Sequence, residues 1–231
     1  MSTPIWQWDE MIQRGTDYEA SKHVAGYDRK MAELRDAATE AEEILNLLGL
    51  TRDDVLLEVG TGTGAFARVA ARRCRKVIAL DVSPVMLAYA TEKAQEQQVT
   101  NVEFAEAGFL TYEHRGEPVA AVVSQLALHH LPDAWKRVAL GRLHGFMREG
   151  GKLYLSDVVY PDQAQDDWPG YFQKLIDSVP EDRRQEMAQH IREEFSTFDW
   201  TMREIIARAG FTLERAQVEG AFLGHYLCRR S

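Results

Sequence analysis

The chain has 231 residues and a formal net charge of -9, with 45% apolar and 27% charged residues, a composition typical of a folded globular protein rather than a disordered one. The 36 acidic residues outnumber the 27 basic ones, so no general positive field exists to hold nucleic acid or an anionic membrane. No apolar run approaches the roughly 20 residues that cross a bilayer, and Cys74 and Cys228 have no metal-site spacing. We therefore expect a cytoplasmic protein with no membrane contact, no metal site and no nucleic-acid partner.

Predicted strands alternate with predicted helices along most of the chain. An amphipathic helix is expected from residue 31 to 48, followed by apolar strands at 55–60, 77–80, 102–105, 119–124 and 153–159, with helices at 65–73, from 84 onward and at 132–146. This alternation predicts an α/β fold with a mostly parallel sheet and helices on both faces. Two final strands, at 211–218 and 222–229, are close enough for a hairpin, which makes the last of seven strands antiparallel.

Residues 160–195 interrupt the alternation. They contain three prolines and the aromatic residues Trp168, Tyr171 and Phe172, which favours a mostly helical insertion. We interpret this insertion as a lid within one domain spanning residues 1–231, in which residues 1–50 form an N-terminal helical cap. Two helix starts are also predicted, one with Ser83 as its N-cap and one from a capping box at residues 196–199.

Glycines alternate between the first predicted strand and its helix, in the sequence E-V-G-T-G-T-G from Glu58 to Gly64. Such glycines let the backbone pass close to a ligand, and the helix that follows presents unpaired N–H groups, so we interpret the segment as a nucleotide-binding turn. The spacing also suits NAD, because Asp81 follows about 20 residues later, where a dinucleotide fold places its ribose-binding acid. Glu58 would repel a diphosphate and attract an ammonium group, which favours an aminoacyl nucleoside.

These segments resemble motifs of the class I S-adenosylmethionine (SAM)-dependent methyltransferases. The glycine turn is similar to their first motif, residues 80–83 (L-D-V-S) to their second-strand acid, and residues 124–132 (S-Q-L-A-L-H-H-L-P) to their fourth-strand segment. The resemblance spans residues 40–160 and 196–229, and it implies a Rossmann-like fold, SAM as cofactor and methyl transfer to the oxygen, nitrogen, sulfur or carbon of a small-molecule acceptor.

The resemblance also implies which residues bind SAM. The implied positions are Tyr27, Glu58, Gly60, Thr61, Gly62, Gly64, Asp81, Val82, Met86, Ala107, Gly108, Phe109, Ser124 and Leu126. The family often has an acidic residue near the position of Gly108, where it meets the adenine amino group. Here the neighbouring residues Ala107 and Phe109 offer none.

Two adjacent histidines, His129 and His130, follow the fourth predicted strand at the edge where such folds bind ligands. An imidazole titrates near neutral pH, so His129 is the first candidate for a base that accepts the proton of the acceptor, and His130 is the second. The alternative is that both histidines only form a structural turn into the next helix.

Three other functions stay open at this point. They are an NAD-dependent oxidoreductase, a SAM-binding regulator without turnover, and an enzyme that cyclises SAM or transfers a group other than methyl. The sequence also leaves the oligomeric state open, with a homodimer among the options.

Overall fold

The structure is a computed structural model that describes residues 4–12, 37–162, 166–220 and 222–231. Its strands are β1 (Val55–Val59), β2 (Lys76–Asp81), β3 (Val102–Glu106), β4 (Val119–Gln125), β5 (Met147–Tyr160), β6 (Thr197–Phe198), β7 (Phe211–Glu219) and β8 (Leu223–Arg230). Its helices are α2 (Ala37–Leu48), α3 (Ala65–Ala70), α4 (Pro84–Glu96), α5 (Asp133–Phe146), α6 (Trp168–Asp177), α7 (Arg184–Glu193) and α8 (Asp199–Arg208), with short 3-10 helices η1 (Leu128–His130) and η3 (Glu181–Arg183).

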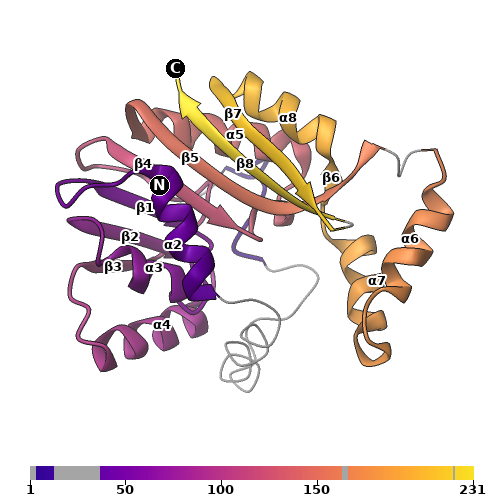
Figure 1. Cartoon of the computed structure of the whole chain (residues 1–231), viewed down its shortest axis with the longest axis horizontal. Coiled ribbons are helices and arrows are strands. Elements are labelled where there is room, and N and C mark those ends of the chain that lie inside the picture. Colours follow the sequence, from indigo (N-terminus) through magenta and orange to yellow (C-terminus); the bar gives the residue numbers. More distant parts are fainter. Residues whose placement is uncertain (1–3, 13–36, 163–165, 221) are drawn as a thin grey trace.

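One twisted sheet connects these elements in the order β3-β2-β1-β4-β5-β8-β7 (Figure 1). The pairs from β3 to β5 are parallel, whereas β8 runs antiparallel to both β5 and β7. The two-residue strand β6 adds a short parallel pair beside β5. This topology confirms the predicted Rossmann-like α/β fold with its antiparallel last strand.

Alternate residues of the central strands pack on opposite faces of the sheet. On one face Leu57 of β1 packs in a cluster with Leu140 of α5 and Ile206 of α8. On the other face Leu56 packs in a second cluster with Ile44 of α2. Helices therefore cover both faces, as predicted, and the sheet forms a rigid platform for the loops at its carboxyl edge.

The glycine turn joins β1 to α3. Gly60 has a φ of +79°, and a Cβ atom there would lie 2.3 Å from the Cβ of Ala127. Both the left-handed backbone and the close approach exclude a larger residue at this position. The turn can therefore lie directly against the loop that follows β4.

The insertion between β5 and β6 contains α6 and α7, which Figure 1 shows beyond the end of β5, apart from the other helices. Its core is small: Tyr160 and Leu175 are buried in a cluster with the partly buried Tyr171 and Phe172. The structure thus contains the predicted helices, while their action as a lid stays a prediction. None of the helices in the described ranges combines the length and apolar character needed to cross a membrane.

One of the two predicted helix caps is present and the other is wrong. Ser83 accepts a hydrogen bond from the backbone N–H of Met86 at 3.3 Å and opens α4 as expected. Helix α8 begins at Asp199, and its N-cap residue Phe198 makes no side-chain cap hydrogen bond. The predicted capping box fails because Ser196 pairs with His190 instead, at 3.0 Å between Oγ and Nε2.

Candidate functional site

A cavity lies at the carboxyl ends of β1, β2 and β4, the edge at which parallel α/β sheets bind ligands. The predicted site residues that line it are Gly60, Gly62, Asp81, Val82, Met86, Ala107, Gly108, Phe109, Leu126 and His130. The lining residues that the sequence did not identify are Glu10, Ile12, Val59, Gln125, Ala127 and Leu131. The structure therefore brings most of the predicted positions around one space.

The other predicted positions are placed differently. Glu58, Thr61, Gly64, Ser124 and His129 are all buried and do not line this cavity. The hydroxyl of Ser124 has no hydrogen-bond partner within the part of the chain that the structure describes. Tyr27 lies outside the described residues, so its contact with SAM stays a prediction.

Asp81 connects the glycine turn to the start of α4. Its Oδ2 accepts a hydrogen bond from the backbone N–H of Gly62 at 2.7 Å, and its Oδ1 accepts one from Ser83 at 2.9 Å. Burial raises the pKa of Asp81 above its usual value, although these N–H groups oppose the shift. The carboxylate is thus held in a fixed orientation at the cavity wall, where it can accept further hydrogen bonds.

Glu58 lies under the same turn, and 4% of the residue is exposed. Its Oε2 accepts a hydrogen bond from the hydroxyl of Thr61 at 2.7 Å. Burial raises the pKa of Glu58 to about 8, with a smaller contribution from the charge of Asp81. Without a ligand, Glu58 is therefore mostly protonated at neutral pH, which the sequence did not reveal.

An acidic residue reaches the Gly108 end of the cavity from the N-terminal segment. Glu10 Oε1 accepts hydrogen bonds from the backbone N–H groups of Leu110 and Thr111, at 2.8 and 2.7 Å, and from the Thr111 hydroxyl at 2.8 Å. Burial raises the pKa of Glu10. The sequence analysis found no acid near Gly108 because this one lies about 100 residues away along the chain.

Leu126 is the non-glycine residue with a left-handed backbone on the cavity wall, with a φ of +53°. Its N–H donates a hydrogen bond to the carbonyl of Ser156 at 2.8 Å, which fixes the end of β4 against β5. Such a backbone costs on the order of 1 kcal/mol in a non-glycine residue and is often found at functional sites.

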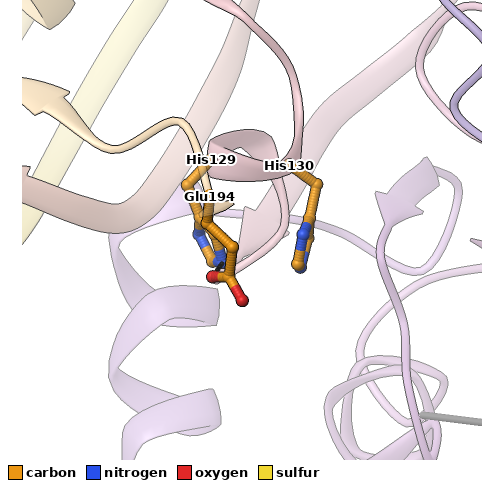
Figure 2. Close-up of side chains that lie close together, drawn as sticks. All are labelled: His129, His130 and Glu194. Carbon is orange, nitrogen blue, oxygen red and sulfur yellow. Dashed lines mark ion pairs between the residues drawn. The ribbon is translucent and has the colours of Figure 1, made fainter. Parts of the chain in front are cut away.

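A second group of polar side chains lies beside the cavity, where η1 meets the residue that follows α7 (Figure 2). His129 Nδ1 lies 2.5 Å from Asp157 Oδ1, and His129 Nε2 lies 3.2 Å from Glu194 Oε2. The same Glu194 oxygen contacts Nδ1 of His190. His129, Asp157 and Glu194 are buried, whereas His130 is partly exposed on the cavity wall.

The two adjacent histidines have different electrostatic surroundings. Burial alone would lower the pKa of His129, yet its ion pairs with Asp157 and Glu194 raise it to about 9. Burial and the neighbouring His129 lower the pKa of His130 to about 4. With both ring nitrogens directed at carboxylates, His129 has no lone pair for an acceptor's proton, so the geometry favours His130 over His129 as a candidate base.

The fold and the cavity together define a class I, Rossmann-like methyltransferase scaffold: a glycine turn after β1, an acid at the end of β2, and a cavity between them. Residues 56–151 match the family model of a methyltransferase domain. This match and the fold make the chain similar to the class I SAM-dependent methyltransferases.

Known proteins are similar over most of the chain. An uncharacterized methyltransferase of Geobacillus thermodenitrificans is 27% identical over 217 residues, covering 94% of this chain and 91% of that protein. A SAM-dependent methyltransferase structure from Aquifex aeolicus has a TM-score of 0.65 at 20% identity and covers 91% of this chain and 98% of that one. The structure of geranyl diphosphate C-methyltransferase from Streptomyces coelicolor A3(2), in complex with S-adenosyl-L-homocysteine, has a TM-score of 0.65 at 14% identity, with coverages of 84% and 76%.

Proposed function

We propose that this chain binds SAM in the cavity at the carboxyl edge of the sheet and transfers its methyl group to a small-molecule acceptor. The observation that carries the proposal is the position of Asp81. Its carboxylate lines the cavity at the end of β2 and is fixed there by the N–H of Gly62 in the glycine turn. A short, oriented carboxylate at a strand end suits the two hydroxyl groups of a ribose.

The lining of the cavity fits the other parts of SAM. Val82, Met86 and Phe109 provide an apolar wall for the adenine, and Glu10 brings a carboxylate toward its amino group. At the glycine turn, Glu58 supplies a buried carboxyl that would ionise beside the ammonium group of the methionine part. A protonated Glu58 can ionise beside an ammonium group, whereas a nearby diphosphate would keep it protonated and gain no ion pair, which favours SAM over NAD.

SAM supplies a methyl group on a sulfonium, an electrophile with its own good leaving group. The protein must then mainly hold the acceptor atom in line and exclude water. His130 lines the cavity between Ala127 and Leu131, so it is the imidazole in position to contact an acceptor or take up its proton. The acceptor atom that receives the methyl group can be oxygen, nitrogen, sulfur or carbon.

Calorimetric titration of the full chain with SAM, S-adenosylhomocysteine and NAD tests the binding part of the proposal. We expect saturable binding of the first two and none of NAD; NAD binding without SAM binding would overturn it. The Asp81→Ala variant controls for binding outside the cavity.

Incubation of the protein with methyl-labelled SAM and a metabolite extract tests the reaction. Mass spectrometry should find a labelled product together with S-adenosylhomocysteine. Formation of methylthioadenosine would indicate transfer of the aminobutyryl group instead, and SAM binding without any product from any extract would indicate a regulator.

A further inference from the structure

Three potential metal ligands converge beside the cavity, from two distant parts of the chain. One donor atom each of His129, His130 and Glu194 lies within 4.8 Å of the others. Figure 2 shows the two histidine rings extending in the same direction from η1, with the Glu194 carboxylate next to His129. His129 and Glu194 are buried, and His130 lines the cavity, so a ligand at this point would be shielded on one side and accessible on the other.

The surrounding residues hold these donors in the orientation of a metal site. Asp157 Oδ1 lies 2.5 Å from His129 Nδ1, and Asp157 Oδ2 accepts a hydrogen bond from the backbone N–H of His129 at 3.1 Å. These contacts direct His129 Nε2 toward Glu194. A carboxylate on the other ring nitrogen is the usual support of a metal-bound histidine. Glu194 is supported in turn by His190, whose other nitrogen lies 3.0 Å from Ser196 Oγ.

The distances suit an ion of modest size. Bonds of about 2.0–2.2 Å in a tetrahedral site separate neighbouring ligand atoms by roughly 3.3–3.6 Å. His129 Nε2 and Glu194 Oε2 are 3.2 Å apart, and a ring nitrogen of His130 lies within 4.8 Å of their donor atoms, so it would move closer when an ion binds. Two buried carboxylates, Asp157 and Glu194, would balance the charge of a divalent cation.

We infer that His129 Nε2, His130 and Glu194 bind one divalent first-row transition-metal ion, such as Zn²⁺, Mn²⁺ or Fe²⁺, at the edge of the cavity. Two imidazoles and one carboxylate favour these ions over Mg²⁺ and Ca²⁺, which prefer oxygen ligands. The ion replaces the proton between His129 and Glu194 and releases it to solvent. Three protein ligands leave at least one coordination position open, where an oxygen, nitrogen or sulfur atom of an acceptor can bind.

The three ligands are not among the residues proposed to contact SAM, although His130 lines the same cavity and, once bound to an ion, would hold the acceptor through that ion rather than act as its base. Metal binding is therefore tested without SAM. The full chain is treated with a chelator and titrated with Co²⁺, followed by its visible absorption, and with Zn²⁺, followed by calorimetry. We expect one equivalent of each ion, no displacement by excess Mg²⁺, and nitrogen ligands in the X-ray absorption spectrum of the Zn²⁺ form.

Two variants and one matched control localise the ion. His130→Gln and Glu194→Gln should each weaken Zn²⁺ binding at least tenfold, whereas His114→Gln, which removes a histidine outside the group, should leave it unchanged. Because Glu194 is buried, circular dichroism checks that the Glu194→Gln variant folds. If that variant does not fold, Zn²⁺ binding by the His130→Gln variant alone tests the inference.

If His129, His130 and Glu194 bind protons but no metal ion, the titrations give a different result. The wild-type chain would then show no saturable Co²⁺ absorption and no Zn²⁺-dependent rise in melting temperature. Either that result, or Zn²⁺ binding that is equally strong in His130→Gln, would overturn the inference while leaving the proposed methyl transfer intact.

Discussion

The Asp81 carboxylate both holds the glycine turn and faces the cavity, so its removal should weaken SAM binding more than the loss of any neighbouring acid. A hydrogen bond to a charged group contributes about 1.5–3 kcal/mol, and 1.4 kcal/mol is a tenfold change in affinity. We therefore expect Asp81→Ala to raise the Kd for SAM by about tenfold to a hundredfold, as measured by calorimetry.

Glu106 provides the matched control for Asp81. It lies opposite Asp81 in the strand register, at the end of the adjacent strand β3, but it is exposed and does not line the cavity. Glu106→Ala should bind SAM as the wild type does. Equal losses in the two variants would show that general charge, rather than the placement of Asp81, controls affinity.

Glu58 should link SAM binding to pH. Burial raises its pKa to about 8, so the unliganded protein carries a proton there at pH 7, and an ammonium group nearby would expel it. Binding of SAM at pH 7 should then release a proton, and affinity should rise as the pH approaches 8. Calorimetry in two buffers of different ionisation enthalpy measures this release.

The Glu58→Gln variant should abolish that proton release, because it cannot ionise. If the wild type shows the same binding enthalpy in both buffers, the ammonium group does not contact Glu58. In the absence of ligand the raised pKa has a second effect: the folded state holds this proton more tightly than the unfolded chain, so its contribution to stability, complete below about pH 4.5, is lost as the pH rises through about 8.

Strand β8 and helix α8 are connected by a buried hydrogen bond, which the Tyr226 hydroxyl donates to Asp199 Oδ1 at 2.6 Å. The Tyr226→Phe change leaves the Asp199 carboxylate short of one donor in a buried position. We expect a loss of about 1.5–3 kcal/mol in the free energy of unfolding, measured with urea.

The Tyr154→Phe variant, on β5, is the control for Tyr226→Phe, because it also removes one tyrosine hydroxyl. Tyr154 pairs with His225 Nδ1 at 3.0 Å in a less buried position, so its change should cost about 1 kcal/mol. Arg203 also donates a hydrogen bond to Asp199, at 2.7 Å. If the Tyr226→Phe variant is as stable as the Tyr154→Phe variant, this bond from Arg203 already satisfies the Asp199 carboxylate.

Patterns within a few residues of sequence predicted the elements and the parts of the site at their ends. The apolar run that ends at Asp81 placed this acid at the sheet edge, and the glycines after Glu58 placed the turn beside it. Glu10 and Glu194 could not be found this way, because Glu10 contacts residues 110 and 111 and Glu194 contacts His129, which all lie in distant segments, and neither acid follows a strand or a recognised motif. Their placement depends on how the N-terminal segment and the insertion pack on the finished sheet.

SAM binding should stabilise the whole molecule, because the cavity joins the loops after β1, β2, β3 and β4. A ligand at a hundred times its Kd adds about 2.7 kcal/mol to the stability of the folded state. For a domain of this size that corresponds to a rise of roughly 5–10 °C in melting temperature. Differential scanning fluorimetry should show this shift with SAM and none with NAD, and a shift retained in full by Asp81→Ala would indicate binding elsewhere.

The position of β8 in the sheet affects how the chain folds during translation. Residues 223–230 lie between β5 and β7 in the sheet, although they are translated after both. A nascent chain that has released β5 therefore keeps one edge of that long strand unpaired until residue 230 leaves the exit tunnel. During that interval the edge can pair with other chains, so a messenger truncated before residue 223 should yield an aggregating product rather than a smaller working enzyme.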